Sequence, residues 1–458
     1  MRKALSILLL AASMAFIWFV LEANTQARLN NGVWIGYNGW LFLNEQEAAA
    51  RVRSELELRQ WRIQLEERRD WLKAQGRDFL VVVAPNKSTV YPEFLPEQVS
   101  SERGVSDLAQ FGEYLKRYPE LNFIDLSAVM KGDRQRQFYF KTDTHWNFEG
   151  GFIGYQTIAE KMPQYFRADE RLTESNIRRV SRFVATNLNK RIDQEEKEQI
   201  NFIMPLKKWS FKMQKPDSDL LKQVALRGTS VTLTKITDVN LPRLLVIGDS
   251  YLGWIRRYLA QHFSRGIYLY LWGEKWSHEE VFPLDLLREE KPDLVMMLFK
   301  ESRIGFCGHP YCIAHPKRMT NPVEVRQARL NRLYSESASA GRAFLLSAEI
   351  DMNGQLAITK QVDRPPFGDS GIWLVELKLS QLEDNISIQV GQKEGDGRCA
   401  NLKEFQKGVI ASADRIYFCL DAPKGLQLSL ESEGVSIGIR SIESIQAVPF
   451  PDLPRAVH

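Results

Sequence analysis

Ser250 has the sequence context of a nucleophile. It closes the run Leu-Leu-Val-Ile-Gly-Asp-Ser that begins at Leu244, and a helix is predicted directly after it, over 252–262. A serine between a buried strand and a helix N-terminus lies beside free N–H groups, which stabilise a developing oxyanion. Asp249 and Ser250 are also good helix caps, so capping alone is the alternative interpretation of the motif.

A serine nucleophile needs a base, and His145 is the first candidate among the six histidines of the chain. Asp143 stands two residues before it, so in an extended segment the two side chains point to the same face. The aspartate can then bind one ring nitrogen while the other takes the serine proton. A purely structural Asp–His pair is the alternative. His278 is the second candidate base, and we expect His262 to lie at the surface.

Apolar segments of the chain predict the sheet that would position these residues. Three continuous, β-branched runs are typical of strands buried on both faces: 79–84, 244–247 and 294–299. Helices are predicted between and around them: 106–117, 150–163, 252–262 and 280–290. This alternation favours an α/β fold with a parallel sheet flanked by helices. Ligands bind at the carboxyl ends of such strands, which is where Ser250 would lie.

The segments outside this pattern give weaker predictions. Val33–Leu43 predicts a β-hairpin with Asn38-Gly39 as a type I′ turn, and 45–75 predicts a long amphipathic helix. The strongly charged segment 187–199 predicts an exposed helix, and 226–236 predicts one strand. No function is predicted for these last two segments.

The composition changes at about residue 345. Short alternating segments separated by Gly- and Asp-rich turns replace the helical pattern and predict an antiparallel β-sandwich domain over 345–450. This domain is a candidate carbohydrate-binding module. Trp373 and Tyr417 are interpreted as core residues, with sugar stacking as the alternative. The preceding catalytic domain is predicted over 32–340.

The first residues resemble an export signal. Arg2 and Lys3 precede an unbroken apolar run, Ala4–Leu21, which is just long enough to span a bilayer. Positive residues before such a run orient the rest of the chain outside the cytoplasm. We interpret 1–24 as a signal anchor in the inner membrane, with a cleaved signal peptide as the alternative. The expected location of the remaining chain is the periplasm.

The four cysteines fit an oxidising compartment. An even number of cysteines in an exported chain predicts disulfides, and the simplest pairing is Cys307–Cys312 with Cys399–Cys419. Zinc binding by Cys307, His309, Cys312 and His315 is the alternative, but this spacing matches no zinc signature, and we expect no metal. The net charge of +4 over 458 residues argues against a nucleic-acid-binding protein.

Four motifs in one order resemble a known family. They are Val33–Leu43 with Gly-Trp-Leu-Phe, Val81–Pro96 with Ala-Pro-Asn-Lys-Ser, Asp143-Thr-His-Trp146, and Gly248-Asp-Ser-Tyr251. Together they resemble the alginate O-acetyltransferase family of the AlgJ and AlgX type, over about residues 32–305. The resemblance implies an SGNH-hydrolase-like fold with Ser250, His145 and Asp143 as the catalytic triad. As in that family, the Asp-x-His pair precedes the serine, which reverses the order of ordinary SGNH hydrolases.

The resemblance also implies an activity. An acetyl group would pass from a membrane-bound O-acyltransferase to Ser250 and then to a hydroxyl of an exopolysaccharide, without a cofactor. A polysaccharide acetyl esterase and a non-catalytic polysaccharide-binding scaffold are the alternatives. The candidate substrate contacts are Tyr251, Trp146, Lys87 and Arg303. The segment Lys300-Glu-Ser-Arg303 matches the family only loosely, so the polymer is not predicted.

Overall fold

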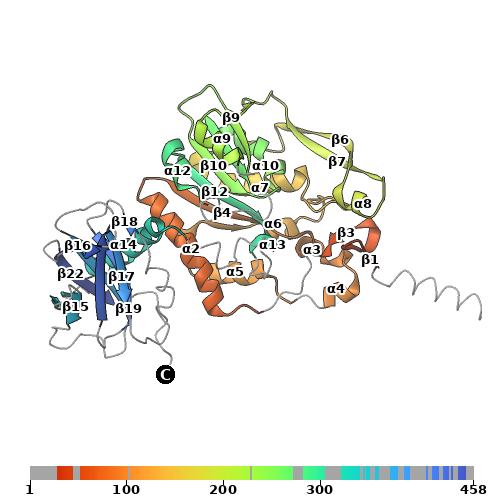
Figure 1. Ribbon diagram of the computed structural model, residues 1–458. Helices are drawn as coiled ribbons and strands as arrows, with labels where there is room; N and C mark the ends of the chain where they lie inside the picture. The colour runs from red at the N-terminus through yellow and green to blue at the C-terminus, as the bar shows by residue number, and fades with distance from the viewer. Residues whose placement is uncertain are drawn as a thin grey trace, which may run out of the picture. The chain divides into compact units, whose positions relative to one another are not determined.

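The computed structural model describes residues 28–44, 52–101, 104–226, 229–271, 282–304 and 321–340, and the strands between 344 and 449 (Figure 1). The chain divides into two compact units, one of residues 1–62 and 77–320 and one of residues 63–76 and 321–458. The predicted signal anchor lies outside the described residues. No helix in the described part of the chain is long and apolar enough to cross a membrane.

A seven-stranded sheet forms the centre of the first unit. Its strand order is β5-β4-β12-β10-β11-β9-β8. The bounds are β4 Asp78–Ala84, β5 Phe123–Asp125, β8 Lys212–Gln214, β9 Ser230–Lys235, β10 Arg243–Gly248, β11 Arg265–Tyr270 and β12 Leu294–Lys300. The five strands from β5 to β11 are parallel, and β9 and β8 continue the sheet antiparallel. The predicted α/β fold is therefore confirmed, and the predicted parallel sheet is found in five strands, while the antiparallel edge formed by β9 and β8 was not predicted.

Helices cover this sheet because its central strands are apolar on both faces. The helices of the first unit, or shared with it, are α2 Glu55–Lys73, α3 Lys87–Val90, α4 Glu97–Ser101, α5 Asp107–Leu115, α6 Ser127–Gly132, α7 Phe148–Lys161, α8 Asn187–Arg191, α9 Asp219–Leu226, α10 Leu252–Leu259, α12 Leu284–Glu290 and α13 Glu301–Ile304. Every residue from Leu244 to Gly248 is buried. Exposing such a strand on either face would cost about 25 cal/mol per Å² of apolar surface.

Two glycines allow the elements around Ser250 to approach closely. A Cβ on Gly151 of α7 would lie 2.4 Å from the carbonyl oxygen of Trp254 in α10, and one on Gly248 would lie 2.2 Å from that of Leu298. Any side chain at either position would push two backbones apart. The contact of α7 with α10 matters because these helices begin just after His145 and Ser250.

The predicted N-terminal hairpin is confirmed. β2 (Val33–Ile35) pairs antiparallel with β3 (Leu41–Leu43), and β1 (Arg28–Asn30) extends the sheet. Asn38 and Gly39 have φ values of 55° and 76°, and Trp40 N–H donates to the Tyr37 carbonyl at 3.1 Å. Positive φ at both central residues is the signature of the type I′ turn.

Residues 187–199 do not form the single exposed helix that the sequence predicts. The helix α8 ends at Arg191, and the chain then forms β7 (Lys197–Pro205), which pairs antiparallel with β6 (Ile177–Ala185). Figure 1 shows these two strands as a hairpin apart from the central sheet. The charged composition favours helix locally, but β6 supplies backbone hydrogen bonds along the whole of β7. The prediction of one exposed helix is therefore wrong beyond Arg191.

The expectation that His262 lies at the surface is also wrong. Its side chain is buried, and Nε2 lies 2.8 Å from the hydroxyl of Tyr155. Burial, with a smaller contribution from the charge of Arg171, lowers the pKa of His262 to about 4. The histidine is therefore neutral at pH 7 and packs as an uncharged side chain against Tyr155 of α7 and Phe166.

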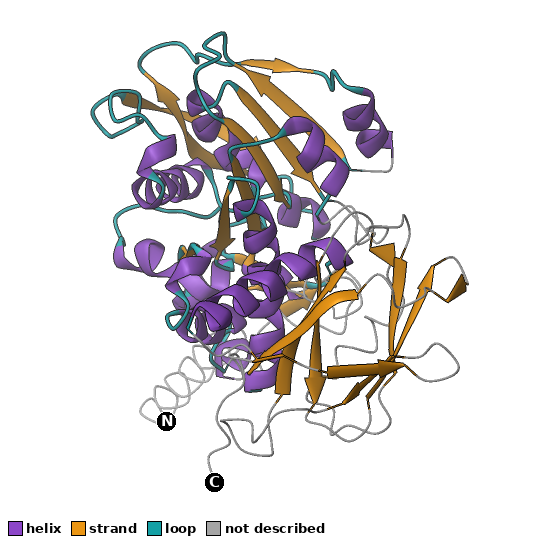
Figure 2. Ribbon diagram, turned by 90° about the vertical axis from the view of Figure 1, so that its left-hand side faces the viewer, coloured by secondary structure: helices purple, strands orange, loops and turns teal. Residues whose placement is uncertain are grey.

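The second unit contains helix α14 (Val323–Ser339) and two antiparallel sheets. One sheet has the order β13-β22-β16-β19, with bounds Phe344–Leu345, Ile442–Pro449, Ile372–Leu379 and Arg415–Asp421. The other has the order β14-β15-β20-β17-β18, with β21 on β20; the bounds are Ser347–Ile350, Leu356–Thr359, Leu426–Ser432, Ile386–Gly391, Val409–Ile410 and Val435–Ser436. Figure 2 shows these strands as a group almost without helices. Packing of the two sheets as a sandwich stays a prediction.

Candidate active site

Asp249 and Ser250 have separate functions at the carboxyl end of β10. The Asp249 carboxylate is buried and accepts hydrogen bonds from the N–H groups of Tyr251 and Lys300, each at 3.0 Å. It therefore fixes the start of α10 against the end of β12. The Ser250 side chain is partly exposed, and its hydroxyl contacts His145 instead of the helix. Capping accounts for Asp249 but not for Ser250.

Ser250, His145 and Asp143 form one continuous chain of hydrogen bonds. Ser250 Oγ lies 2.7 Å from His145 Nε2, and His145 Nδ1 lies 2.6 Å from Asp143 Oδ1. His145 and Ser250 are 105 residues apart in the sequence. Because an ionised carboxylate can only accept, Nδ1 carries the imidazole proton and Nε2 is free to accept the proton of Ser250. The expected geometry is present.

The electrostatics of Asp143 favour the charged carboxylate. Burial alone would raise its pKa, but the hydrogen bond and charge of His145 and the backbone N–H groups of Asn187 and His145 outweigh it. The net effect lowers the pKa of Asp143 below its ordinary value. The carboxylate is therefore ionised at neutral pH, where it orients the imidazole and would stabilise an imidazolium.

Most of the backbone N–H groups expected to be free beside Ser250 are already bonded within the turn. The N–H of Tyr251 donates to Asp249 Oδ1, and those of Leu252, Gly253 and Trp254 donate to carbonyls three residues earlier. In the described part of the chain the N–H of Ser250 has no such acceptor. The N–H of Ser250 is therefore the backbone donor available to the oxyanion that forms when the Ser250 hydroxyl attacks a carbonyl group.

Asn187 supports the Asp–His pair and was missed from the sequence. Its backbone N–H donates to Asp143 Oδ2 at 2.9 Å. Its side chain accepts from Thr144 N–H at 3.0 Å and donates to Thr144 Oγ1 at 2.9 Å. Asn187 therefore holds both carboxylate and backbone of the segment that carries His145. No local pattern marks a residue that acts 44 positions away.

Glu198 of β7 is a second missed support. Its carboxylate accepts from the N–H groups of Lys141 and Thr142 at 2.8 and 3.1 Å, and from the Thr142 hydroxyl at 2.9 Å. Gln137 Nε2 donates to it at 3.1 Å. One carboxylate thus ties the start of the Asp143 segment to the β6–β7 hairpin. The misassigned helix over 187–199 concealed this position.

Three predicted substrate contacts are buried supports instead. Lys87 Nζ donates to the carbonyls of Phe140, Lys141 and Asp143 at 3.2, 2.9 and 2.8 Å. Trp146 Nε1 donates to the Tyr251 carbonyl at 3.0 Å, and this carbonyl belongs to the residue after Ser250.

The Tyr251 hydroxyl completes this support by donating to the Thr144 carbonyl at 2.8 Å. Lys87, Trp146 and Tyr251 are at most 2% exposed, so they cannot present a surface to a polymer. They lock the segment of His145 onto the start of α10. Arg303, the fourth candidate, lies half-buried in α13, directly after β12.

The predicted disulfides lie outside the described residues. This holds for Cys307, Cys312 and Cys399, and for the side chain of Cys419, whose backbone is part of β19. His278 and the alternative zinc ligands His309 and His315 lie there as well. Within the described ranges, no three His, Cys, Asp or Glu side chains gather as metal ligands.

Residues 33–271 match the family model described as "SGNH hydrolase-like domain, acetyltransferase AlgX". The match covers just over half of the chain. The chain belongs to this family. Asp143, His145 and Ser250 all lie within the matched residues.

Two curated relatives are similar over part of their length. Both are named "Probable alginate O-acetylase AlgJ". The protein from Pseudomonas syringae pv. tomato is 23% identical over 167 residues, which are 35% of this chain and 41% of the relative. That from Pseudomonas putida is 27% identical over 148 residues, which are 31% of this chain and 37% of the relative. The chain thus spans less than half the length of the relatives it matches.

Among solved structures, that of Bacillus cereus PatB1 with a sulfonyl adduct is similar. The two chains are 18% identical, and the similarity covers 62% of this chain and 99% of the other, with a TM-score of 0.47.

Proposed function

We propose that this chain is a serine O-acetyltransferase that moves an acetyl group onto hydroxyls of an exopolysaccharide. The observation that supports this most is the chain of hydrogen bonds from Ser250 through His145 to Asp143 in a member of an SGNH hydrolase-like acetyltransferase family. Alginate is named for the two curated relatives and is the first acceptor to test.

In the first half-reaction, Ser250 takes the acetyl group. Its Oγ attacks the acetyl carbonyl while its proton passes to His145 Nε2. The carbonyl oxygen becomes an oxyanion, which the N–H of Ser250 stabilises. The bond to the donor oxygen then breaks, and that oxygen leaves with the proton held by His145. Asp143 remains ionised and holds the imidazole throughout.

In the second half-reaction, a sugar hydroxyl replaces the donor. His145 Nε2 removes the hydroxyl proton as the sugar oxygen attacks the acetyl-serine. The ester bond to Ser250 breaks, and Ser250 Oγ takes the proton back. The products are an acetylated sugar and the free enzyme. If water attacks instead, the same residues release acetate, so occupation of the site by the sugar decides the outcome.

We also propose a periplasmic location at the inner membrane, where a membrane-bound O-acyltransferase would supply the acetyl group. The charge pattern of Arg2 and Lys3 before Ala4–Leu21 supports this location. We further propose that the C-terminal strands form a carbohydrate-binding module, which would keep a polymer near the active site.

The experiment uses the full-length protein in detergent with p-nitrophenyl acetate as donor and oligouronates as acceptors. Mass spectrometry should detect acetylated oligosaccharide with the unaltered protein and none with Ser250→Ala. Acetate release without sugar acetylation across several acceptors would instead identify an esterase. Equal product with Ser250→Ala would contradict both enzymes and favour the binding scaffold.

A further inference from the structure

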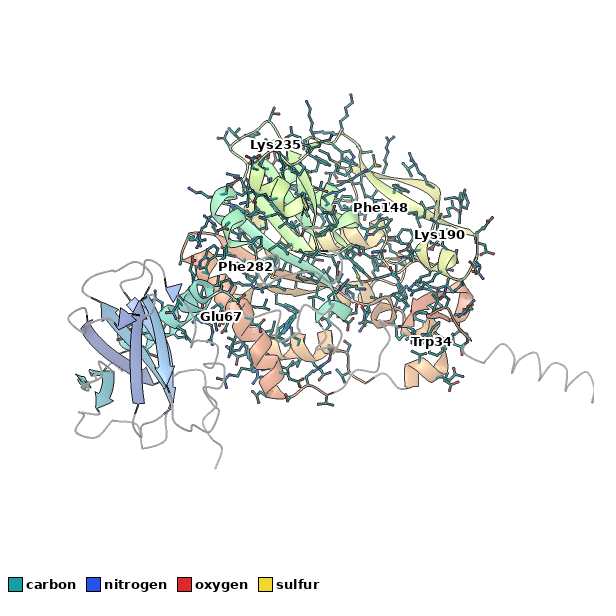
Figure 3. All side chains as sticks on the ribbon, in the orientation of Figure 1. Trp34, Glu67, Phe148, Lys190, Lys235 and Phe282 are labelled. Carbon is teal, nitrogen blue, oxygen red and sulfur yellow. The ribbon has the colours of Figure 1, made fainter. Side chains whose placement is uncertain are left out.

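A row of aromatic rings leads from His145 to the β6–β7 hairpin. The ring centroid of Trp254 lies 6.2 Å from that of His145 and 5.0 Å from that of Phe148. The Phe148 ring in turn lies 4.3 Å from that of Phe202 in β7. Figure 3 labels Phe148 near the base of this hairpin. Trp254, Phe148 and Phe202 are all partly exposed, so the row reaches the surface.

Arg182 lies at the far end of this row. Its guanidinium carbon lies 5.4 Å from the centre of the Phe202 ring, and the side chain is exposed. Arg182 makes no ion pair within the described ranges. Arg179 of the same strand differs, because its guanidinium is bound by Glu149 and Glu174 at 2.5–3.0 Å. One arginine of β6 is thus neutralised, while Arg182 keeps an available charge.

Simple core packing explains only part of this arrangement. Phe148 and Trp254 do pack against the buried core. A core edge, however, gains little from a cation over its last ring, because a cation–π contact exposed to water is weak. The row also begins beside the histidine that contacts Ser250. Packing therefore does not explain why the row has Arg182 at one end and the catalytic candidate His145 at the other.

We propose that this row and Arg182 form the acceptor subsite, and that it binds a sugar bearing a carboxylate. This inference rests on the proposed function. Sites for organic ligands combine aromatic surfaces with a few polar groups that fix orientation. The apolar faces of sugar rings would lie on Trp254 and Phe202. The planar guanidinium of Arg182 would bind the carboxylate through two parallel hydrogen bonds, as arginine commonly does.

The test compares two acceptors that differ only in charge. One is an oligouronate, and the other is the same oligosaccharide with its carboxyl groups reduced to alcohols. Arg182→Gln should raise the KM for the oligouronate about tenfold, because losing one charged hydrogen-bonded contact of this kind costs about that factor. The KM for the reduced acceptor and the hydrolysis of p-nitrophenyl acetate without acceptor should stay unchanged.

Two further variants separate charge from stacking. Lys161→Gln removes an exposed charge from the opposite end of α7 and should change neither KM. Phe202→Leu keeps an apolar side chain but removes the ring. It should raise the KM for both acceptors by about three- to tenfold, in line with aromatic contacts of 0.5–1.5 kcal/mol.

The inference fails if Arg182→Gln leaves the KM for the oligouronate unchanged. It also fails if this variant slows ester hydrolysis as much as transfer, since Arg182 would then act through the fold. Calorimetric binding of the oligouronate to Ser250→Ala carries the same expectation without turnover. Weaker binding after adding Arg182→Gln would therefore support the subsite even if the acetyl-transfer proposal failed.

Discussion

Two regions of the molecule hold carboxylates in different ways. At the candidate active site of the first unit, backbone N–H groups hold the carboxylates: those of His145 and Asn187 donate to Asp143. Those of Lys141 and Thr142 donate to Glu198 of β7. In the second unit, the part of α2 after Arg62 lies against α14 through ion pairs between side chains. Arg329 pairs with Glu66 at 2.8 Å, and Arg332 pairs with Asp70 at the same distance.

The difference corresponds to what each region must do. Glu66 and Arg329 have side-chain exposures of 2% and 3%, so this ion pair joins two helices in a place closed to solvent. The side chains of His145 and Asp143 remain 19% and 13% exposed. Backbone donors fix Asp143 from within the protein and leave the other side of the imidazole open to Ser250.

Ser250→Ala should have the largest effect. Without the hydroxyl, no acetyl-serine forms, and we expect a loss of roughly ten-thousandfold or more in acetyl transfer and in ester hydrolysis. The free energy of unfolding should change by less than about 1 kcal/mol, because the serine does not cap the helix. Steady-state kinetics and urea denaturation measure the two effects. A Ser250→Ala variant that is strongly destabilised but still active would show that Ser250 serves stability and not catalysis.

Arg329→Met tests the other region and should mainly affect stability. Removing one partner leaves the Glu66 carboxylate buried without this cation, and we expect a loss of about 3–5 kcal/mol in the free energy of unfolding. The hydrolysis of p-nitrophenyl acetate by folded protein should not change. The double variant with Glu66→Leu removes both charges and should recover most of the loss. Failure of this recovery would show that the pair is not the relevant interaction.

Glu198→Gln should give a smaller effect on catalysis. The amide keeps the shape of the side chain but brings an NH₂ group against donors of Lys141 or Thr142, which shifts the Asp143 segment. Because small misplacements of catalytic groups are costly, we expect kcat to fall by about ten- to a hundredfold. Glu195→Gln, an exposed residue of the same hairpin, is the matched control and should be active. Equal activity of both variants would remove the supporting function of Glu198.

The dependence of stability on pH should show the smallest effect. The folded pKa of Asp143 is lower than its ordinary value of 3.8, so the ionised group stabilises the fold above that pH. This contribution is lost as the pH falls through the folded pKa. The difference in free energy of unfolding between the unaltered chain and Asp143→Asn should therefore shrink as the pH is lowered from about 5 through the folded pKa of Asp143. Urea denaturation at several pH values measures it, and a difference that grows in acid would contradict the assignment.

Short-range patterns in the sequence were sufficient for the elements that carry the triad. The runs at 79–84, 244–247 and 294–299 are apolar at every position, which only a strand covered on both faces tolerates, and all three form the parallel sheet. The spacing of two residues was enough to predict that Asp143 meets His145, although the structure brings them together in a bend, where the His145 N–H donates to the Asp143 carboxylate, and not along an extended strand. The strand, turn and helix around Ser250 were likewise visible in consecutive residues. These features depend on the local pattern of apolar and polar residues, which can be recognised within a few consecutive positions.

The tertiary structure decided which distant residues meet. Asn187 and Glu198 support Asp143 and Thr142 from 44 and 56 positions away, and only the pairing of β6 with β7 brings them there. That pairing also overrode the local preference of 192–199 for helix. The burial of Trp146 and Tyr251 has the same origin, since a side chain's exposure is set by the elements packed over it. Such contacts depend on how separate segments close onto one another, and no single segment encodes that.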